Sequence, residues 1–245
     1  ILMKTTTYIL FYLAFFSDVL YSQNIKKIQP TKIVKCQVEE PSDIVINPLK
    51  ENSCFVVSDK GSVFEINENG EIIRESSFRG IDTEAVFAKD SVVFVVEEFG
   101  RKINQLQNST LDVFQRNTAQ YGGGRNKAFE SFTYNEIKKK YIIITEKDPT
   151  ILFELDSQMA VVNEMDLGDI ARDISAATFY NNKLWLLSDE DRTVFMLDPK
   201  TYKVENKWLL PIINPEGIAF SRNGQMIVVS DDRKLIYFFN TSDLN

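Results

Sequence analysis

The strongest constraint on the fold is a pattern that occurs five times along the chain. In this pattern an apolar run ends in a small polar residue plus a carboxylate, and another apolar run follows soon after. The copies are FVVSDKGSVFEI (55–66), FVVEEFGRKINQL (94–106), IIITEKDPTILFEL (142–155), LWLLSDEDRTVFML (184–197) and MIVVSDDRKLIYFF (226–239). A second marker precedes each copy: EPSDIVI (40–46), DTEAVFA (82–88), FESFTYN (129–135), DISAATFY (173–180) and PEGIAFS (215–221). Both markers repeat at about 43 residues, the length of one four-stranded propeller blade.

This period predicts an all-β chain that folds as a single five-bladed β-propeller. The fifth repeat contains only three apolar runs, so we expect residues 31–38 to supply its outer strand and to close the ring. An all-β sandwich also has regular strands, but it would not repeat both markers at a four-strand period. The expected blades cover residues 42–77, 84–116, 130–167, 175–208 and 217–240.

The N-terminal residues predict a secretory signal peptide over 1–22, ahead of a propeller domain over 23–245. From Met3 the sequence reads MKTTTYILFYLAFFSDVLYSQN, in which one lysine precedes an apolar run and small residues lie near Ser22. The first two residues precede the methionine and are expected to be extraneous. We expect cleavage after Ser22 and a periplasmic, cell-envelope or extracellular location. An uncleaved N-terminal anchor is the alternative.

Composition excludes several classes of function. The chain has no histidine, which removes Ser-His-Asp and Cys-His catalysis and histidine-ligated zinc. Its formal net charge is −7, so no basic surface for nucleic acid is expected. A bound metal would have oxygen ligands, which favours calcium or magnesium. The two cysteines, Cys36 and Cys54, form one disulfide in an oxidising compartment or, on the simpler interpretation, are small buried residues of strands.

The second marker predicts where carboxylates meet. In a propeller the first strand of each blade lines the central channel, and Glu84, Glu130 and Glu216 begin such strands, as Asp173 does in the fourth repeat. A calcium ion, which takes six to eight oxygen ligands, suits a ring of this kind. The alternative is that each carboxylate only caps a turn. The sequence therefore predicts a metal site of Glu84, Glu130, Asp173 and Glu216 with calcium as the cofactor.

Carboxylates also end the second strands, where a tight turn follows. Such residues usually organise the turn, and we expect that role here in preference to ligand binding. The glycine-rich segment 121–127 is expected to be a connecting loop between the second and third repeats. The carboxylates in question are Asp59, Glu98, Glu146, Asp189 and Asp231.

With these residues laid out, the chain from about residue 38 to 240 resembles the SdiA-regulated domain family. The resemblance implies a five-bladed propeller distantly related to NHL-repeat proteins, with a calcium site and no established reaction. The glycine that follows the motif glutamate is kept only at Gly217. The segments that carry the resemblance are GIDTEAVFAKDSVVFVVEEFGRKI, FESFTYNEIKKKYIIITEKDPTILFEL, DISAATFYNNKLWLLSDEDRTVFMLD and PEGIAFSRNGQMIVVSDDRKLIYFF.

These observations lead us to expect an exported, monomeric, non-enzymatic propeller that holds calcium near its axis. One face would bind an unidentified small molecule or a cell-envelope partner, and no nucleic acid. The first alternative is a calcium-dependent hydrolase of lactones or phosphoesters, with Glu84 or Glu216 as the general base. The second is a purely structural propeller without metal.

Overall fold

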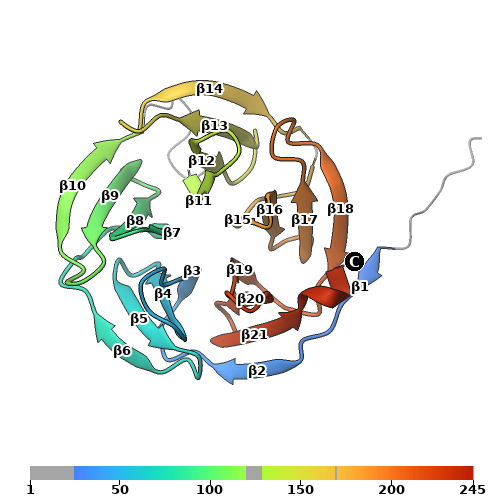
Figure 1. The fold of residues 1–245 in the computed structure, drawn as a ribbon, viewed down its shortest axis with the longest axis horizontal. Coiled ribbons are helices and arrows are strands. Elements are labelled where there is room, and N and C mark those ends of the chain that lie inside the picture. Colours follow the sequence, from blue (N-terminus) through green and yellow to red (C-terminus); the bar gives the residue numbers. More distant parts are fainter. Residues whose placement is uncertain (1–24, 120–128, 169, 245) are drawn as a thin grey trace, which may run out of the picture.

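The computed structural model describes residues 25–119, 129–168 and 170–244. Five sheets surround a central axis, with β3, β7, β11, β15 and β19 next to the axis and the other strands of each sheet farther out (Figure 1). We call these sheets blades 1 to 5 in chain order. The predicted five-bladed β-propeller is therefore confirmed, and the sandwich alternative is excluded.

The blades are built from consecutive antiparallel strands. From the axis outward they are β3 (Pro41–Ile46), β4 (Ser53–Ser58), β5 (Val63–Asn67) and β6 (Ile72–Glu75) in blade 1; β7 (Thr83–Lys89), β8 (Val92–Glu97), β9 (Lys102–Gln107) and β10 (Val113–Thr118) in blade 2; β11 (Phe129–Asn135), β12 (Lys140–Thr145), β13 (Ile151–Leu155) and β14 (Val161–Asp166) in blade 3; β15 (Ala176–Tyr180), β16 (Lys183–Ser188), β17 (Thr193–Leu197) and β18 (Val204–Leu209) in blade 4; and β19 (Pro215–Phe220), β20 (Gln225–Ser230) and β21 (Leu235–Asn240) in blade 5.

The N-terminal part of the described chain closes the ring. Strand β2 (Lys32–Lys35) pairs antiparallel with β21 and supplies the outer strand of blade 5, as the sequence predicts. The amide of Thr31 donates to the carbonyl of Phe238 at 2.7 Å, next to this ladder. A second contact was not expected: the two-residue strand β1 (Lys26–Lys27) pairs parallel with β18 at the rim of blade 4. The described chain ends in a short 3-10 helix, η1 (Thr241–Leu244).

Burial explains why the second strand of each blade is a continuous apolar run. All residues of β4 are buried, as are most residues of β8, β12, β16 and β20, because each of these strands is covered on both faces by the neighbouring blades. A strand buried on both faces has no solvent side on which to place polar residues. The outer strand β14, by contrast, is almost entirely exposed. The hydrophobic core is thus divided among the contacts between blades.

Both cysteines lie in the apolar core that joins blade 1 to blade 5, and neither forms a disulfide. Burial raises the pKa of the Cys36 thiol to about 11 and that of Cys54 to about 12. They therefore behave as small buried residues, as in the simpler of the two interpretations.

Two predicted segments, the signal peptide over 1–22 and the glycine-rich loop over 121–127, lie outside the described residues. Within the described residues, no helix has the length and apolar character needed to span a membrane.

Candidate functional site

A β-bulge lies at the start of the inner strand in blades 1, 2, 3 and 5. In each case one residue is left without a partner on the second strand: Ser42, Glu84, Glu130 and Glu216. These are the residues that the second sequence marker aligns. Because a bulge breaks the alternation of the ladder, it re-aims the side chain of the extra residue. In blade 4 the inner strand begins one residue after Ser175 and pairs without such a shift.

The three bulged glutamates converge at one mouth of the central channel. Burial raises the pKa of Glu130 well above its usual value, and the negative charges of Glu84, Glu98, Glu146 and Glu216 raise it further. Glu130 is therefore close enough to carboxylates of blades 2, 3 and 5 to feel their charge. The structure thus brings together three of the four residues that the sequence selects.

Among the described residues, a close group of three carboxylates lies between blades 1 and 2. One carboxylate oxygen from each of Asp59, Asp82 and Glu84 lies within 4.8 Å of the other two. Asp59 follows β4, whereas Asp82 and Glu84 flank the first residue of β7. Asp82 has a positive φ of 58°, a conformation that aspartate adopts more readily than most residues. Three carboxylate oxygens this close together are able to coordinate a hard cation.

Electrostatics make this mouth unfavourable for a set of ionised carboxylates alone. Burial raises the pKa of Glu84 to about 8, helped by the charges of Asp59, Asp82 and Glu98, while a hydrogen bond from Ser42 opposes the shift. Burial also raises the pKa of Asp59, with Asp82 as the next cause. At neutral pH the carboxyl group of Glu84 therefore either retains its proton or is neutralised by a cation.

Glu216, on blade 5, lies in the same region of negative electrostatic potential. Burial raises its pKa to about 9, and the charges of Asp189, Glu84 and Asp231 add to the effect. The pKa of Asp189 is itself raised to about 6, first by burial and then by the charge of Asp173. The unfavourable negative potential therefore extends from blade 2 to blades 4 and 5.

Asp173 is placed differently from the glutamates. It is only 3% exposed. Its Oδ1 accepts hydrogen bonds from Ser188 Oγ at 2.5 Å and from the amide of Glu190 at 3.1 Å, and its Oδ2 accepts one from the amide of Asp189 at 3.2 Å. Both oxygens thus organise the turn after β16. Asp173 contributes negative charge to the mouth and fits the turn-capping alternative.

The carboxylates at the ends of the second strands lie at the same mouth, although the sequence assigns them to turns. In an antiparallel pair, the end of the second strand lies beside the start of the first, and the registers of Pro41 with Ser58 and of Thr83 with Glu97 show this. The two sequence markers are therefore neighbours across each hairpin. That pairing is the sequence observation from which Asp59 could have been included in the site.

Below the mouth, the inner strands of blades 1 and 5 come into backbone contact. A Cβ atom at Gly217 would lie 2.7 Å from the Cα of Asp43 and 2.7 Å from the amide nitrogen of Ile44. Glycine is thus required where β19 passes β3, which explains why the motif glycine is kept here. The carboxylate of buried Asp43 accepts hydrogen bonds from the amides of Ile44 at 2.8 Å and Val86 at 2.9 Å, so it ties the inner strands of blades 1 and 2 together.

The fold and this site define the class of the protein as a five-bladed β-propeller with an acidic channel mouth. The family model described as SdiA-regulated matches residues 18–240, and the chain belongs to this family. The resemblance noted in the sequence is thereby confirmed.

Two solved structures share the architecture. The crystal structure of glutaminyl cyclase from Myxococcus xanthus is similar with a TM-score of 0.71 at 11% identity, covering 87% of this chain and 96% of that one. The β-propeller domain of Cps50 (Swd1) from Myceliophteria thermophila is similar with a TM-score of 0.57 at 8% identity, covering 87% and 99%. At such identities the likeness shows the fold alone.

Proposed function

We propose that the protein is an exported, calcium-binding β-propeller that serves as a binding or scaffold module. The observation that carries the proposal is the group of three carboxylate oxygens, from Asp59, Asp82 and Glu84, within 4.8 Å of one another. Glu130 and Glu216 are close enough to Glu84 to interact with its charge, and Asp173 adds charge from the turn of blade 4. Export rests on the signal-peptide pattern of residues 1–22.

The donor set fits calcium on chemical grounds. Every group at the mouth named above is a carboxylate, and hard cations such as calcium take six to eight oxygen ligands in an irregular arrangement. The raised pKa values of Glu84 and Glu216 indicate sites where ionisation is unfavourable until positive charge is supplied. A bound calcium would supply that charge. The bulges aim the glutamates at the mouth, and the hydrogen bond from Ser42 offsets only part of the rise in the pKa of Glu84.

Calcium titration by isothermal calorimetry, together with melting in calcium, magnesium or EDTA, tests the proposal. Wild type should bind calcium and melt higher with it than in EDTA. Glu84→Gln and Asp59→Asn should each weaken binding at least tenfold. Glu164→Gln, at an exposed position of β14, is the matched control and should bind like wild type. Equal melting of the wild type in calcium and EDTA, with no heat of binding, would overturn the proposal.

A calcium-dependent hydrolase is the second candidate, favoured by one observation. The pKa of Glu84, about 8, lies near neutral pH, where a general base is most effective. A panel of lactones and phosphoesters in calcium would show turnover that Glu84→Gln removes and Glu164→Gln keeps. Calcium binding without turnover of any substrate would leave the binding module as the function.

A further inference from the structure

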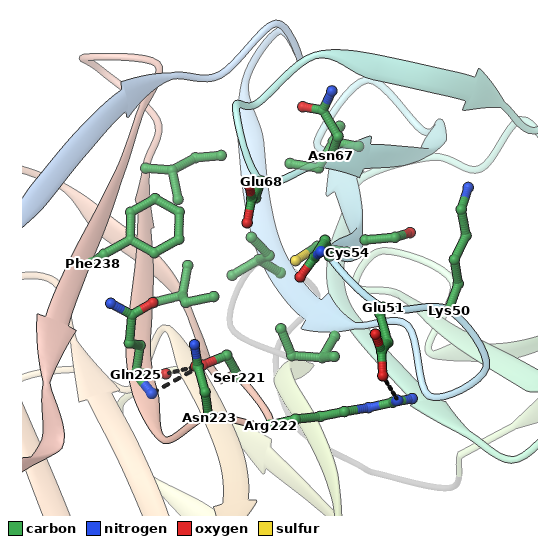
Figure 2. A pocket seen from close by; sticks show the side chains of 17 residues that line it. Lys50, Glu51, Cys54, Asn67, Glu68, Ser221, Arg222, Asn223, Gln225 and Phe238 are labelled. Carbon is green, nitrogen blue, oxygen red and sulfur yellow. Dashed lines mark hydrogen bonds and ion pairs between the residues drawn. The ribbon is translucent and has the colours of Figure 1, made fainter.

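A cavity of about 260 Å³ lies between blades 1 and 5, away from the acidic mouth (Figure 2). Its residues come from the end of β3, the start of β4 and the turn between β19 and β20, so it opens at the opposite end of the inner strands from Glu84 and Glu216. Its walls are apolar and come from both blades. They include Ile44, Ile46, Cys54, Ile227, Ile236 and Phe238.

Aromatic side chains fill the corresponding space between other blades. Between blades 4 and 5, the rings of Tyr180 and Phe220 stack with centroids 4.3 Å apart. Between blades 2 and 3, Phe132 packs against Phe94 at 5.6 Å. Ile46 occupies the position in blade 1 that Phe220 has in blade 5, counted from the bulge. Its smaller side chain leaves room that interiors usually fill.

The rim of the cavity is polar and balanced in charge. Two cations line it: Lys50 pairs with buried Glu65 at 3.0 Å, and Arg222 pairs with Glu51 at 3.7 Å. Figure 2 shows Arg222 reaching across the opening to Glu51. Glu68 adds a second carboxylate to the rim beside Glu51, and neutral amides complete it. They belong to Asn52, Asn67, Asn223 and Gln225.

The chemistry of the walls favours reversible binding over covalent reaction. Cys54 is the thiol that lines the cavity, and burial raises its pKa to about 12. A neutral thiol is a poor nucleophile. The volume lies just below the range of roughly 300–1,000 Å³ found for pockets that hold drug-sized ligands, so the occupant is small.

We infer that this cavity is a second binding site, for a small aliphatic molecule with an uncharged polar head group such as an amide or alcohol. The aliphatic chain lies among the isoleucines of blades 1 and 5. The head group lies at the rim, where the amides of Asn223 and Gln225 offer hydrogen bonds and each lining cation already has a carboxylate partner. The site is separate from the acidic mouth and does not require calcium.

Three molecules with one chain length test the inference: octanamide, octanoate and octylamine. Calorimetry should show octanamide binding to the wild type, with octanoate and octylamine at least tenfold weaker. Ile46→Trp fills the cavity and should abolish binding. Ile137→Trp, in the exposed turn after β11, is the matched control and should bind like wild type. Gln225→Leu, which removes one rim amide at similar size, should weaken octanamide severalfold even if Ile46→Trp fails to fold.

The outcomes separate this site from the proposed function. EDTA and Glu84→Gln should leave octanamide binding unchanged. No binding of octanamide, or equal binding by wild type, Ile46→Trp and Gln225→Leu, would overturn the site. If octanoate binds as tightly as octanamide, Arg222 leaves Glu51 to pair with the ligand. That result would overturn the inference that the ligand has an uncharged head group.

Discussion

Replacing Glu216 with glutamine is expected to stabilise the calcium-free protein at neutral and alkaline pH. Burial and neighbouring carboxylates raise the pKa of Glu216 from 4.5 to about 9. The folded state therefore binds this proton more tightly than the unfolded state does. The group contributes its full stability below pH 4.5, and this contribution is lost as the pH rises toward 9. Glutamine cannot ionise, so the variant avoids the loss.

The magnitude follows from the same shift. Each pH unit between the two pKa values costs about 1.4 kcal/mol for one group, or about 4 kcal/mol from pH 4.5 to 7.5. Glu216 is partly exposed and shares its field with Glu84, so solvent screening and relaxation reduce this sum. We expect about 2 kcal/mol at pH 7.5, which is a rise of about 4–8 °C in melting temperature for a domain of this size.

Melting followed by circular dichroism in EDTA, from pH 4.5 to 8.5, measures the effect. Wild type and Glu216→Gln should melt together at pH 4.5 and separate as the pH rises, whereas the control Glu164→Gln should follow wild type throughout. Calcium should raise the melting temperature of wild type more than that of the variant. Two results would contradict the raised pKa of Glu216. One is a lower melting temperature for Glu216→Gln than for wild type at pH 7.5. The other is an equal dependence of melting temperature on pH in the two proteins.

Three further predictions concern packing and buried charge. Gly217→Ala should lose about 3 kcal/mol in urea unfolding, because its Cβ meets backbone, whereas Gly100→Ala, which meets only a flexible lysine side chain, should lose less than 1 kcal/mol. Arg74→Met should lose about 3 kcal/mol at pH 7, because it removes an ion-pair partner of buried Glu65. The pKa of Glu65 is about 2, so the stabilisation from its ionised form is present above pH 4.5 and is lost as the pH falls toward 2. The difference in unfolding free energy between wild type and Arg74→Met should therefore narrow at low pH. An equal difference at pH 3 and pH 7 would contradict the ion pair as its cause. Although Cys54 lines the cavity, its pKa of about 12 keeps the thiol protonated, so it should react slowly with iodoacetamide at pH 8 until guanidinium unfolds the chain. Mass spectrometry would show the labelling, and rapid reaction of the native protein would refute the raised pKa.

The sequence predicted the ring because its two markers are local features with a regular period. Each marker corresponds to one structural event, since the bulges fall on Glu84, Glu130 and Glu216 and the turns follow the second strands. The closing strand was predictable because the fifth repeat lacks a strand and residues 31–38 lack a blade. The sequence shows that Gly217 is the one glycine kept after a motif glutamate. Only the structure explains why, since β3 passes too close to Gly217 for a Cβ atom.

Other features depend on contacts between blades, and the sequence could not supply them. Asp59 meets Asp82 only because the end of β4 lies beside the start of the next blade. Asp173 lies two residues before the position in blade 4 that aligns with the glutamates, and only the structure shows that its carboxylate accepts from the amides after β16. The cavity arises where blade 1 meets blade 5, whose residues are most distant along the chain.

The closure by β2 has a consequence for how the chain reaches its native state. Thr31 and Phe238 are hydrogen-bonded across 207 positions of sequence, so β2 stays without its partner strand until nearly all of the sequence up to β21 has been synthesised. Such remote pairing slows folding, since chain entropy must be lost before the contact forms. During that interval the unpaired backbone of β2 is open to strands from other molecules. A cell that makes this protein therefore benefits from keeping the nascent chain unfolded, or shielded, until its first and last strands can meet.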